Sequence, residues 1–562
     1  HDKSETYFLG KDQQLNLAYI SSIPLKGIEQ VRVHWLLDLV TVSLSNMSDP
    51  CENHLYLMLY AQNHLICFFR TNKILSFELM GSPSGYFTDF EDKQQVMEWR
   101  NLIFRTAQRY IKKYGLLQVS QWNFETWNEP DNHDFDNVSV TINGFQNYYD
   151  ACSEGLKQAR ETLNFILKPI MFRKVCRFSL LCLCFTGAGG SFYILEQEIE
   201  TVNEIQKRFP LFKNVPIYND EADPLVGWST PQSWRGDVTY AAMVVKIIDQ
   251  HLQLLSNKSN SINYSLLSND NAFMNFHPHY FSQRTLTARF QMNNTNPPHV
   301  QMVRKPVLTV MGFLALLGEV QISTEVLITD SNAKNSNIIG AIGSTHEPEK
   351  GELADSWQST ILCYASDDNK TSPTINSITV NMTNFPKSKD LVYVTYYLDN
   401  NLTNPFVEWQ KVGSPDFPTI KQFQQIRDME DPIRKGPIAF PKDGNLLLKV
   451  QLPIPSVFLI HICEKPHSAP NKVTGLHFLP LTKGEVAVIW SDEHITSRCL
   501  KTFEVEFSET GSTYGRINKK DTMFNLFIFS PESAVVSGSY RVRAINYWDV
   551  PGLYSLPQQY TE

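Results

Sequence analysis

The stretch WNFETWNEPDNHDF, residues 122–135, runs apolar and aromatic and then stops at a carboxylate followed by proline. Side chains alternate along a strand, so four residues are expected on one face: Asn123, Glu125, Trp127 and Glu129. Proline donates no hydrogen bond to a ladder, so Pro130 predicts the strand end. An aromatic wall suits the apolar face of a sugar, and burial beside Trp127 would raise the pKa of Glu129, as a general acid requires.

Strands and helices alternate around this stretch. Further strands are expected at Gln30–Trp35, Ile74–Met80, Val215–Asn219 and Tyr264–Ser268. One helix is expected to open at a Thr88/Glu91 capping box, to close at Gly115, and to bury Val96, Trp99, Ile103, Ala107, Tyr110 and Tyr114. A second has the apolar face Ile142, Phe145, Tyr148, Cys152, Leu156 and Ala159, a third spans 196–208, and Asp237 caps a fourth through Val238, Val244, Ile248 and Leu255.

This alternation predicts a parallel sheet in a first domain, residues 1–318. Four of its strands end in polar groups: His34, Glu129, Glu221 and Asp270. In a (β/α)8 TIM barrel the carboxyl ends of the strands form the active-site face. An open doubly wound sheet would place its site there too, but the chain has no glycine fingerprint for a nucleotide.

The pattern changes near Gln321. Strands without intervening helices are expected at Ser359–Ala365, Ser377–Met382, Leu391–Leu398 and Leu446–Cys463, which predicts a β-sandwich over 319–465. A proline-bearing break precedes a segment, 472–562, that resembles a fibronectin type III module, with Trp490 in one strand and Ser539–Asn546 in another. Cys463 and Cys499 flank this junction and can form a disulfide.

Composition narrows the class of protein. A chain of 562 residues with 42% hydrophobic residues is too long for one core, and a net charge of −8 without a long basic run argues against nucleic acid. Cys176, Cys182 and Cys184 lack zinc-finger spacing, and glycines interrupt the uncharged run Phe178–Leu195, so neither a metal nor a membrane span is expected. Eight sequons favour a secreted or luminal glycoprotein: Asn46, Asn137, Asn257, Asn263, Asn293, Asn369, Asn381 and Asn401. The start at His1 without methionine indicates processing or a fragment.

Glu221 is the second informative carboxylate, because it ends a strand in YNDEADP. With Glu129 it can form the pair that glycoside hydrolysis requires, about 5–5.5 Å apart in an enzyme that retains configuration. The alternative is that both are solvated loop carboxylates.

A family resemblance supports the catalytic interpretation. The chain resembles glycoside hydrolase family 39, of the retaining clan A glycosidases built on (β/α)8 barrels, over nearly all of its length, through SGSYRVRAINYW. The motifs that carry the resemblance are FELMGSPSGYFTDFEDKQQV, WNFETWNEPDNHDFDNVS, IYNDEADPLVGWS, LLSNDNAF, QRTLTARFQMNNT and SDEH. It implies a lysosomal enzyme, reached through the secretory pathway, that removes non-reducing terminal α-L-iduronate from dermatan sulfate and heparan sulfate without metal or organic cofactor.

The resemblance also assigns roles. Glu129 is the acid/base and Glu221 the nucleophile. The substrate-binding set is Asn128 at the hydroxyl beside the reacting carbon, His34 and Asp270 at further hydroxyls, Arg284 at the iduronate carboxylate with the amides of Gly227 and Trp228, and His1 near the site. Asn293 carries a glycan near the site. The alternatives are a core histidine for His34, a turn residue for Asp270 and a surface arginine for Arg284.

Two stretches, 42–74 and 161–195, resemble the family poorly. Between Glu129 and Glu221 a barrel needs two more strands, and 161–195 shows no amphipathic helix. No residue matches a family lysine that binds the substrate carboxylate, although Lys168 and Lys174 lie nearby. The barrel is therefore complete or lacks elements around 161–195, and the rival interpretation is a glycoprotein that lost catalysis with them. The sequence leaves the oligomeric state open.

Overall fold

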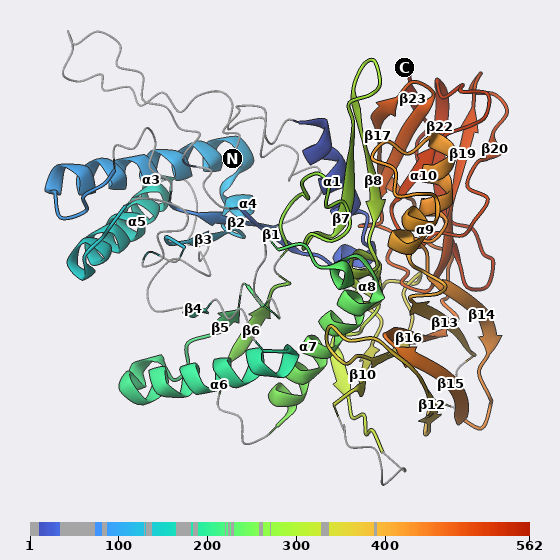
Figure 1. Cartoon of the computed structure of the whole chain (residues 1–562), viewed down its shortest axis with the longest axis horizontal. Helices are drawn as coiled ribbons and strands as arrows, with labels where there is room; N and C mark the ends of the chain where they lie inside the picture. Colours follow the sequence, from blue (N-terminus) through green and yellow to red (C-terminus); the bar gives the residue numbers. More distant parts are fainter. Residues whose placement is uncertain are drawn as a thin grey trace. The chain divides into compact units, whose positions relative to one another are not determined.

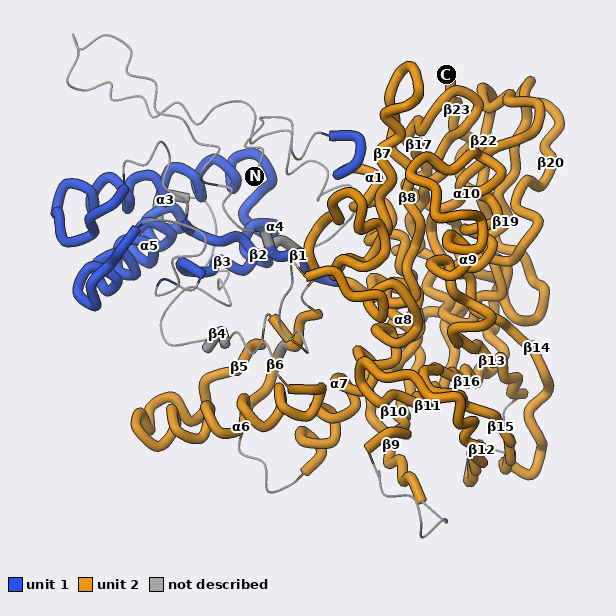
Figure 2. The backbone as a smooth tube through the Cα atoms, viewed as in Figure 1, with its two compact units in different colours: residues 1–13, 29–181 blue, residues 14–28, 182–562 orange. Residues whose placement is uncertain are grey.

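The computed structural model describes residues 10–33, 37, 74–80, 87–128, 130, 138–163, 181–183, 189–219, 221–222, 225, 230–257, 262–269, 271–327, 337–386 and 390–562. The chain divides into two compact units, drawn in blue and orange in Figure 2. Unit 1 holds residues 1–13 and 29–181, and unit 2 holds residues 14–28 and 182–562. No helix of the described part is long and apolar enough to cross a membrane.

Unit 1 contains a parallel sheet in the order β1-β2-β3, as the alternation of strands and helices predicts (Figure 1). Its elements are β1 (Gln30–Val33), β2 (Ile74–Glu78), β3 (Asn123–Glu125), α3 (Lys93–Tyr114), α4 (Leu116–Val119) and α5 (Ile142–Leu163), and the helix α1 (Lys11–Ser21) straddles the two units. Helices α3 and α5 lie side by side.

Helix α3 begins later than the capping box predicts. Its N-cap is Asp92, whose side chain accepts from the backbone N–H of Gln94 at 2.7 Å, whereas the N–H of Thr88 donates to the side chain of Gln95 at 2.9 Å. The Thr88/Glu91 box is therefore wrong, because the carboxylate of Asp92, four residues after Thr88, accepts from a first-turn N–H of the helix. The predicted end is confirmed, since Gly115 has φ 85° and its N–H donates to the carbonyl of Ile111.

The facing sides of α3 and α5 bury an aromatic core. Rings of Phe90 and Tyr148 lie 5.2 Å apart at their centroids, and the indole N–H of Trp99 donates to Cys152 Sγ at 3.3 Å. Tyr148, Cys152, Leu156 and Ala159 are buried as predicted. Ile142 is not, with 79% of its surface exposed at the first position of α5.

Unit 2 begins with a second set of strands and helices. They include a sheet in the order β4-β5-β6, in which β5 and β6 run parallel, and an antiparallel pair, β7 and β8. The elements are η2 (Pro24–Lys26), β4 (Leu181–Leu183), α6 (Ser191–Arg208), η5 (Pro210–Phe212), β5 (Ile217–Asn219), η6 (Ser233–Gly236), α7 (Val238–Ser256), β6 (Tyr264–Leu267), β7 (Thr287–Met292), β8 (His299–Arg304) and α8 (Pro306–Leu314). The predicted cap of α7 is confirmed, because Asp237 accepts from the N–H of Thr239 at 2.8 Å.

Two antiparallel sheets follow, in the orders β14-β13-β16-β11-β10-β9 and β12-β15. They enclose one hydrophobic core, while the other face of the larger sheet packs against α7 and α8. The elements are β9 (Val320–Ile322), β10 (Ile339–His346), β11 (Gln358–Ala365), β12 (Ser372–Met382), β13 (Leu391–Asp399), α9 (Pro405–Lys411), α10 (Ile420–Arg427), β14 (Ile433–Ala439), β15 (Leu446–Ile454) and β16 (Ser456–Glu464). The prediction of strands without helices is wrong here, because α9 and α10 separate β13 from β14.

The C-terminal segment is a β domain. Its sheets, β17-β18-β21 and β20-β19-β22-β23, share a core that includes Trp490, Phe503 and Tyr540. The strands are β17 (Thr474–Thr482), β18 (Glu485–Ser491), β19 (Leu500–Ser508), β20 (Gly515–Arg516), β21 (Leu526–Phe529), β22 (Gly538–Asn546) and β23 (Gln558–Tyr560).

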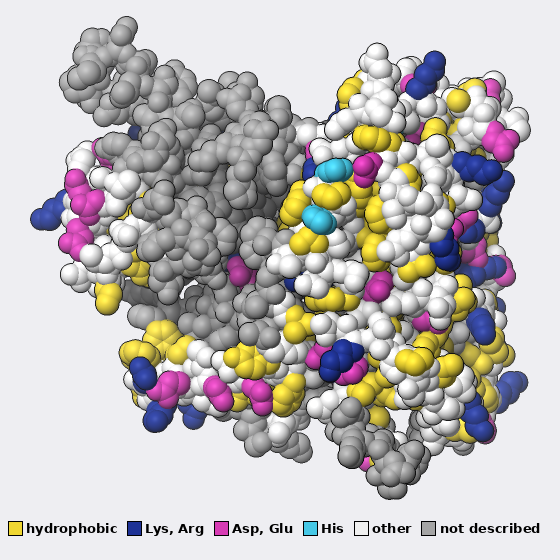
Figure 3. Space-filling model, in the orientation of Figure 1, with side chains coloured by type: hydrophobic (Ala, Val, Ile, Leu, Met, Phe, Trp, Pro, Cys, Tyr) yellow, Lys and Arg dark blue, Asp and Glu magenta, His cyan; other side chains and the backbone are white. Residues whose placement is uncertain are grey.

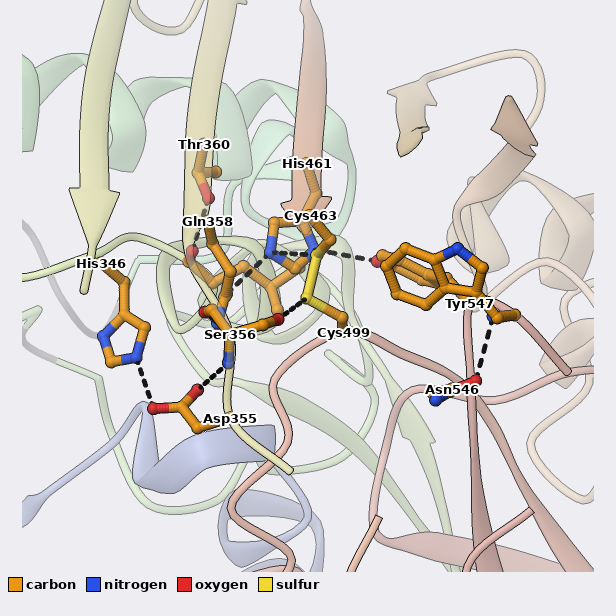
Figure 4. The surroundings of a disulfide bond; sticks show 12 residues. His346, Asp355, Ser356, Gln358, Thr360, His461, Cys463, Cys499, Asn546 and Tyr547 are labelled. Carbon is orange, nitrogen blue, oxygen red and sulfur yellow. Dashed lines mark hydrogen bonds and ion pairs between the residues drawn. A yellow bond between two sulfur atoms is a disulfide. The ribbon is translucent and has the colours of Figure 1, made fainter. Parts of the chain in front are cut away.

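The predicted disulfide is confirmed between Cys463 of β16 and Cys499, and it ties the larger sheet to the C-terminal domain (Figure 4). His461 lies beside both sulfurs. Because those sulfurs are bonded to each other, this group cannot supply thiolate ligands to a metal.

A buried histidine lies near the same junction, on β10. His346 contacts Glu319 through Nδ1 at 2.7 Å and Asp355 through Nε2 at 2.9 Å, and Arg498 pairs with Glu319 at 2.6 Å. Burial alone lowers the pKa of His346, but the bonds to Asp355 and Glu319 raise it above its ordinary value. Burial alone raises the pKa of both carboxyls, but the bond to His346, together with backbone hydrogen bonds and the neighbouring positive charges, leaves each pKa below its ordinary value.

This group of charges predicts a pH-dependent stability. The contribution of His346 is complete below its ordinary pKa of 6.5 and is lost as pH rises through the raised value. The carboxylate contributions are complete above the ordinary pKa of 4.5 for Glu319 and are lost as pH falls through the lowered values. The urea midpoint of the parent chain should therefore exceed that of His346→Gln most between these two pH values. A gap that His467→Gln, at an exposed histidine, reproduces would contradict this origin.

Candidate active site

The described residues include three of the predicted site residues, namely Asn128, Glu221 and Arg284. Six others lie outside the described residues: His1, His34, Glu129, Gly227, Trp228 and Asp270. The sequons Asn46 and Asn137 lie outside them as well. Asn128 belongs to unit 1, and Glu221 and Arg284 belong to unit 2.

In unit 1, the strand that leads to the WNEP motif is shorter than predicted. The ladder of β2 and β3 ends with the pair Glu78 and Glu125, and the N–H of Leu79 donates to the carbonyl of Glu125 at 2.8 Å. Beyond that point the N–H of Asn128 donates to the carboxylate of Glu78 at 2.8 Å. A side chain thus takes the backbone bond that a longer strand would need, so the prediction that the strand continues to Glu129 is wrong.

Trp127 is also placed differently from the prediction. It is 4% exposed, and its ring packs against Phe90 and Tyr148 at centroid distances of 6.4 and 6.0 Å. The indole is therefore part of the core of unit 1, and the prediction that it forms a sugar-facing wall is wrong. Its burial anchors the first residue of the WNEP motif.

Arg32 of β1 orients the residue that precedes the predicted acid. Its Nε donates to Glu125 at 2.6 Å, and its Nη2 donates to Asn128 Oδ1 at 2.9 Å. Because a guanidinium only donates, it fixes which end of the Asn128 amide is the oxygen. The sequence analysis did not single out Arg32. Its signal is an arginine inside an apolar strand, two residues before His34 and so in phase with it.

In unit 2, Glu221 follows β5 and is half-buried. The N–H of Ser268 donates to the carbonyl of Asn219 at 2.8 Å, and the N–H of Ala222 donates to the carbonyl of Ser268 at 3.2 Å. The pairing of the parallel strands therefore continues past their ends. It holds the segment with Glu221 beside the segment that leads to Asp270.

The segment around Arg284 is bonded to one residue further along the chain from each of these two segments. The N–H of Ala272 donates to the carbonyl of Arg284, and the N–H of Gln232 donates to the carbonyl of Ser282, each at 2.8 Å. Arg284 is 5% exposed, so the alternative of an ordinary surface arginine is wrong. Backbone hydrogen bonds in unit 2 thus join the segment around Arg284 to Ala272 and to Gln232.

Lys305 holds the backbone of the segment that contains Arg284. It is fully buried, and its Nζ donates to the carbonyl of Gln283 at 2.8 Å. Burial, with the neighbouring charge of Arg235, holds the pKa of Lys305 well below its ordinary value, and burial raises the pKa of Asp237 to about 6. The sequence analysis missed Lys305, which precedes Pro306 at the start of α8 and gave no motif.

The sequence analysis also did not identify a second set of residues, which is bonded to the backbone of Glu221. Glu198 of α6 is buried, as is Asn219. Asn219 Nδ2 donates to Glu198, and Asn219 Oδ1 accepts from the N–H of Glu221 at 3.0 Å. The available signal is that Glu198 falls on the apolar stripe of its helix, with Ile194, Leu195 and Val202.

The chain matches the models of two known protein families. The model of glycosyl hydrolases family 39 matches residues 1–167 and 177–447, and the model described as the alpha-L-iduronidase C-terminal domain matches residues 474–562. The chain belongs to glycosyl hydrolase family 39. The family match runs through 42–74 and resumes at 177, so membership does not stop at either stretch that resembles the family poorly.

Proteins that are similar to this chain along its whole length support its place in this family. The α-L-iduronidase of Mus musculus is 51% identical over 590 residues, with 100% of this chain and 92% of that protein covered. The α-L-iduronidase of Homo sapiens is 49% identical over 593 residues, with 100% and 89% covered. A solved structure of a bacterial orthologue of human α-L-iduronidase is 24% identical with a TM-score of 0.81, and 100% and 96% of the two chains are covered. This family 39 chain is therefore a glycoside hydrolase of mixed helix and sheet with a C-terminal β domain.

Proposed function

We propose that this chain is a retaining glycosidase that removes non-reducing terminal α-L-iduronate from dermatan sulfate and heparan sulfate. The observation that carries the proposal is the 51% identity across the whole chain to an enzyme named for this activity. The rival, a glycoprotein without activity, is less favoured, because the family match continues on both sides of 168–176.

The reaction follows the two-carboxylate route on the carboxyl-terminal face of a (β/α)8 barrel. Glu129 protonates the leaving oxygen while Glu221 attacks the anomeric carbon, so the glycosidic bond breaks as an ester to Glu221 forms. Glu129 then takes a proton from water, and the water oxygen displaces Glu221 with a second inversion. Asn128 binds the hydroxyl beside the reacting carbon. The hydrogen bonds between the segments after β5 and β6 support this placement of Glu221.

The remaining residues bind the rest of the substrate. His34, Asp270 and His1 bind sugar hydroxyls, and the amides of Gly227 and Trp228 assist Arg284 at the carboxylate. Acidic and basic side chains are interspersed on the described face in Figure 3, so attraction of a polyanion depends on such local groups.

We also propose that the chain is glycosylated and that it reaches the lysosome through the secretory pathway. Six sequon asparagines lie in the described part of the chain, and each is exposed where a glycan can be attached: Asn257, Asn263, Asn293, Asn369, Asn381 and Asn401.

The experiment that tests the activity is hydrolysis of an aryl α-L-iduronide at acidic pH by the glycosylated chain. The first-formed iduronate should keep the α configuration in a proton NMR time course. Turnover no greater than that of Glu221→Gln would refute the activity, and a first product of β configuration would refute the retaining mechanism.

Arg284 gives the specificity prediction. A buried guanidinium binds a carboxylate through two charge-assisted hydrogen bonds, so Arg284→Gln should raise KM for the iduronide by about 10–100-fold. The matching α-L-idoside, with an alcohol in place of the carboxylate, should lose little affinity. Arg208→Gln, at an exposed arginine of α6, serves as the control. Equal losses on both substrates would show that Arg284 supports the fold and not the substrate carboxylate.

A further inference from the structure

We infer that Glu198 is a positioning residue for Glu221 and acts through the side-chain amide of Asn219. The inference rests on the proposed role of Glu221 as nucleophile. Glu198 does not touch substrate in this scheme. It sets the direction of one amide group, and that amide holds the backbone N–H of Glu221 at 3.0 Å.

The donor and acceptor roles in these hydrogen bonds allow only one orientation of the Asn219 side-chain amide. Oε1 of Glu198 accepts from Asn219, so Glu198 fixes the Nδ2 end of Asn219 toward itself. The Oδ1 end then faces the N–H of Glu221, where an acceptor is required. With 1% of Glu198 and none of Asn219 exposed, water cannot replace either partner from bulk solvent.

His251 of α7 holds the other oxygen of Glu198. Its Nδ1 lies 2.7 Å from the carbonyl of Ile247, which only accepts, so Nδ1 carries a hydrogen. Its Nε2 lies 2.8 Å from Glu198 Oε2, and one proton lies between these two atoms. The 3% exposed ring therefore keeps the Glu198 carboxyl in one orientation.

Tyr264 completes the set from the neighbouring strand, with its hydroxyl donating to Glu198 Oε1 at 3.0 Å. The carboxyl of Glu198 thus contacts side chains of β5, β6 and α7 from its own helix α6. Loss of its acceptor character would free the side chain of Asn219 and weaken the bond that this side chain makes to the N–H of Glu221. A displacement of about 1 Å at a reacting group can slow catalysis by about 10²-fold.

The variant that tests this is Glu198→Gln, which keeps shape but presents an NH₂ group to either Asn219 or His251. If that group faces Asn219, the amide of Asn219 must turn and lose its bond to Glu221. We expect kcat for an aryl α-L-iduronide to fall by about 10²-fold, with KM changed by less than about threefold. Glu200→Gln, at an exposed position of the same helix, should match the parent chain.

A covalent trap separates this inference from the proposed function. A 2-deoxy-2-fluoro-α-L-iduronyl fluoride should label Glu221 of the parent chain, as peptide mass spectrometry would show, and labelling should be slower in Glu198→Gln. Asn219→Ala should slow labelling to a similar extent, and the double variant should be no slower than either one, because both break the same connection. Asn219→Ala also decides the question if Glu198→Gln does not fold.

The outcomes are distinct. Labelling of the parent chain at another residue would overturn the assignment of Glu221 and hence the proposed function. Labelling of Glu221 in the parent chain, with parental rates in Asn219→Ala or additive losses in the double variant, would overturn only the role of Glu198.

Discussion

Glu221→Ala is expected to lower kcat/KM for an aryl α-L-iduronide by about 10³-fold or more, because no other group then attacks the anomeric carbon. The smaller side chain leaves room for an external anion beside the end of β5. Azide should restore part of the turnover and give an iduronyl azide of inverted configuration, since a single displacement replaces two. The measurement is steady-state kinetics with and without azide, followed by NMR of the azide product.

The control for this variant is Glu196→Ala, which removes an exposed carboxylate of α6. It should retain parental activity and show no response to azide. Azide that fails to restore Glu221→Ala while the variant keeps the parental urea midpoint would count against Glu221 as nucleophile. Restoration with a product of retained configuration would count against it more strongly, because that product requires an intact covalent intermediate.

Rules that act over a few residues predicted the local structure well. Asp237 caps α7 because its carboxylate and the N–H of Thr239 are neighbours in sequence. Gly115 closes α3 for a similarly local reason, the positive φ that it adopts there. The parallel pairing of β1, β2 and β3 also follows, since strands that alternate with helices must run the same way.

The errors arise where a distant side chain competes with a local rule. Alternation extends β3 to Glu129, but Glu78, from another strand, captures the N–H of Asn128 and ends the ladder early. From the sequence, Trp127 is predicted to be an exposed aromatic residue, but in the structure Tyr148 of α5 packs against it. Both effects depend on contacts between segments about 50 or fewer residues apart, which no pattern within residues 122–135 contains.

The residues of the candidate site also fall into those that local patterns predict and those that only contacts between elements reveal. Glu221 was found because it ends a strand, which is a local feature. The support behind it was not, since Glu198, Asn219 and His251 come from three elements and meet only when α6 and α7 pack beside β5. Arg284 resembles a surface residue in sequence, and its burial is seen only in the structure, where its segment is bonded to Ala272 and Gln232.

Glu129→Gln is expected to act on a different step from Glu221→Ala. Loss of a general acid slows the reaction by about 10²–10⁴-fold when the leaving group needs a proton. An iduronide with a 2,4-dinitrophenyl leaving group does not need one, so its first step should remain fast. The intermediate on Glu221 should then accumulate, because water lacks its base. A stopped-flow burst of dinitrophenol, equal to the enzyme concentration, is the expected signal.

The direction of azide substitution then separates the two carboxylates. In Glu129→Gln, azide needs no base and attacks the ester on Glu221, so the product keeps the configuration of the substrate. In Glu221→Ala the product is inverted. Since the two variants remove the same functional group, a loss of folding or of substrate affinity cannot produce opposite configurations. Inverted azide from Glu129→Gln, or the absence of a burst with a fast second step, would assign the acid/base to another residue.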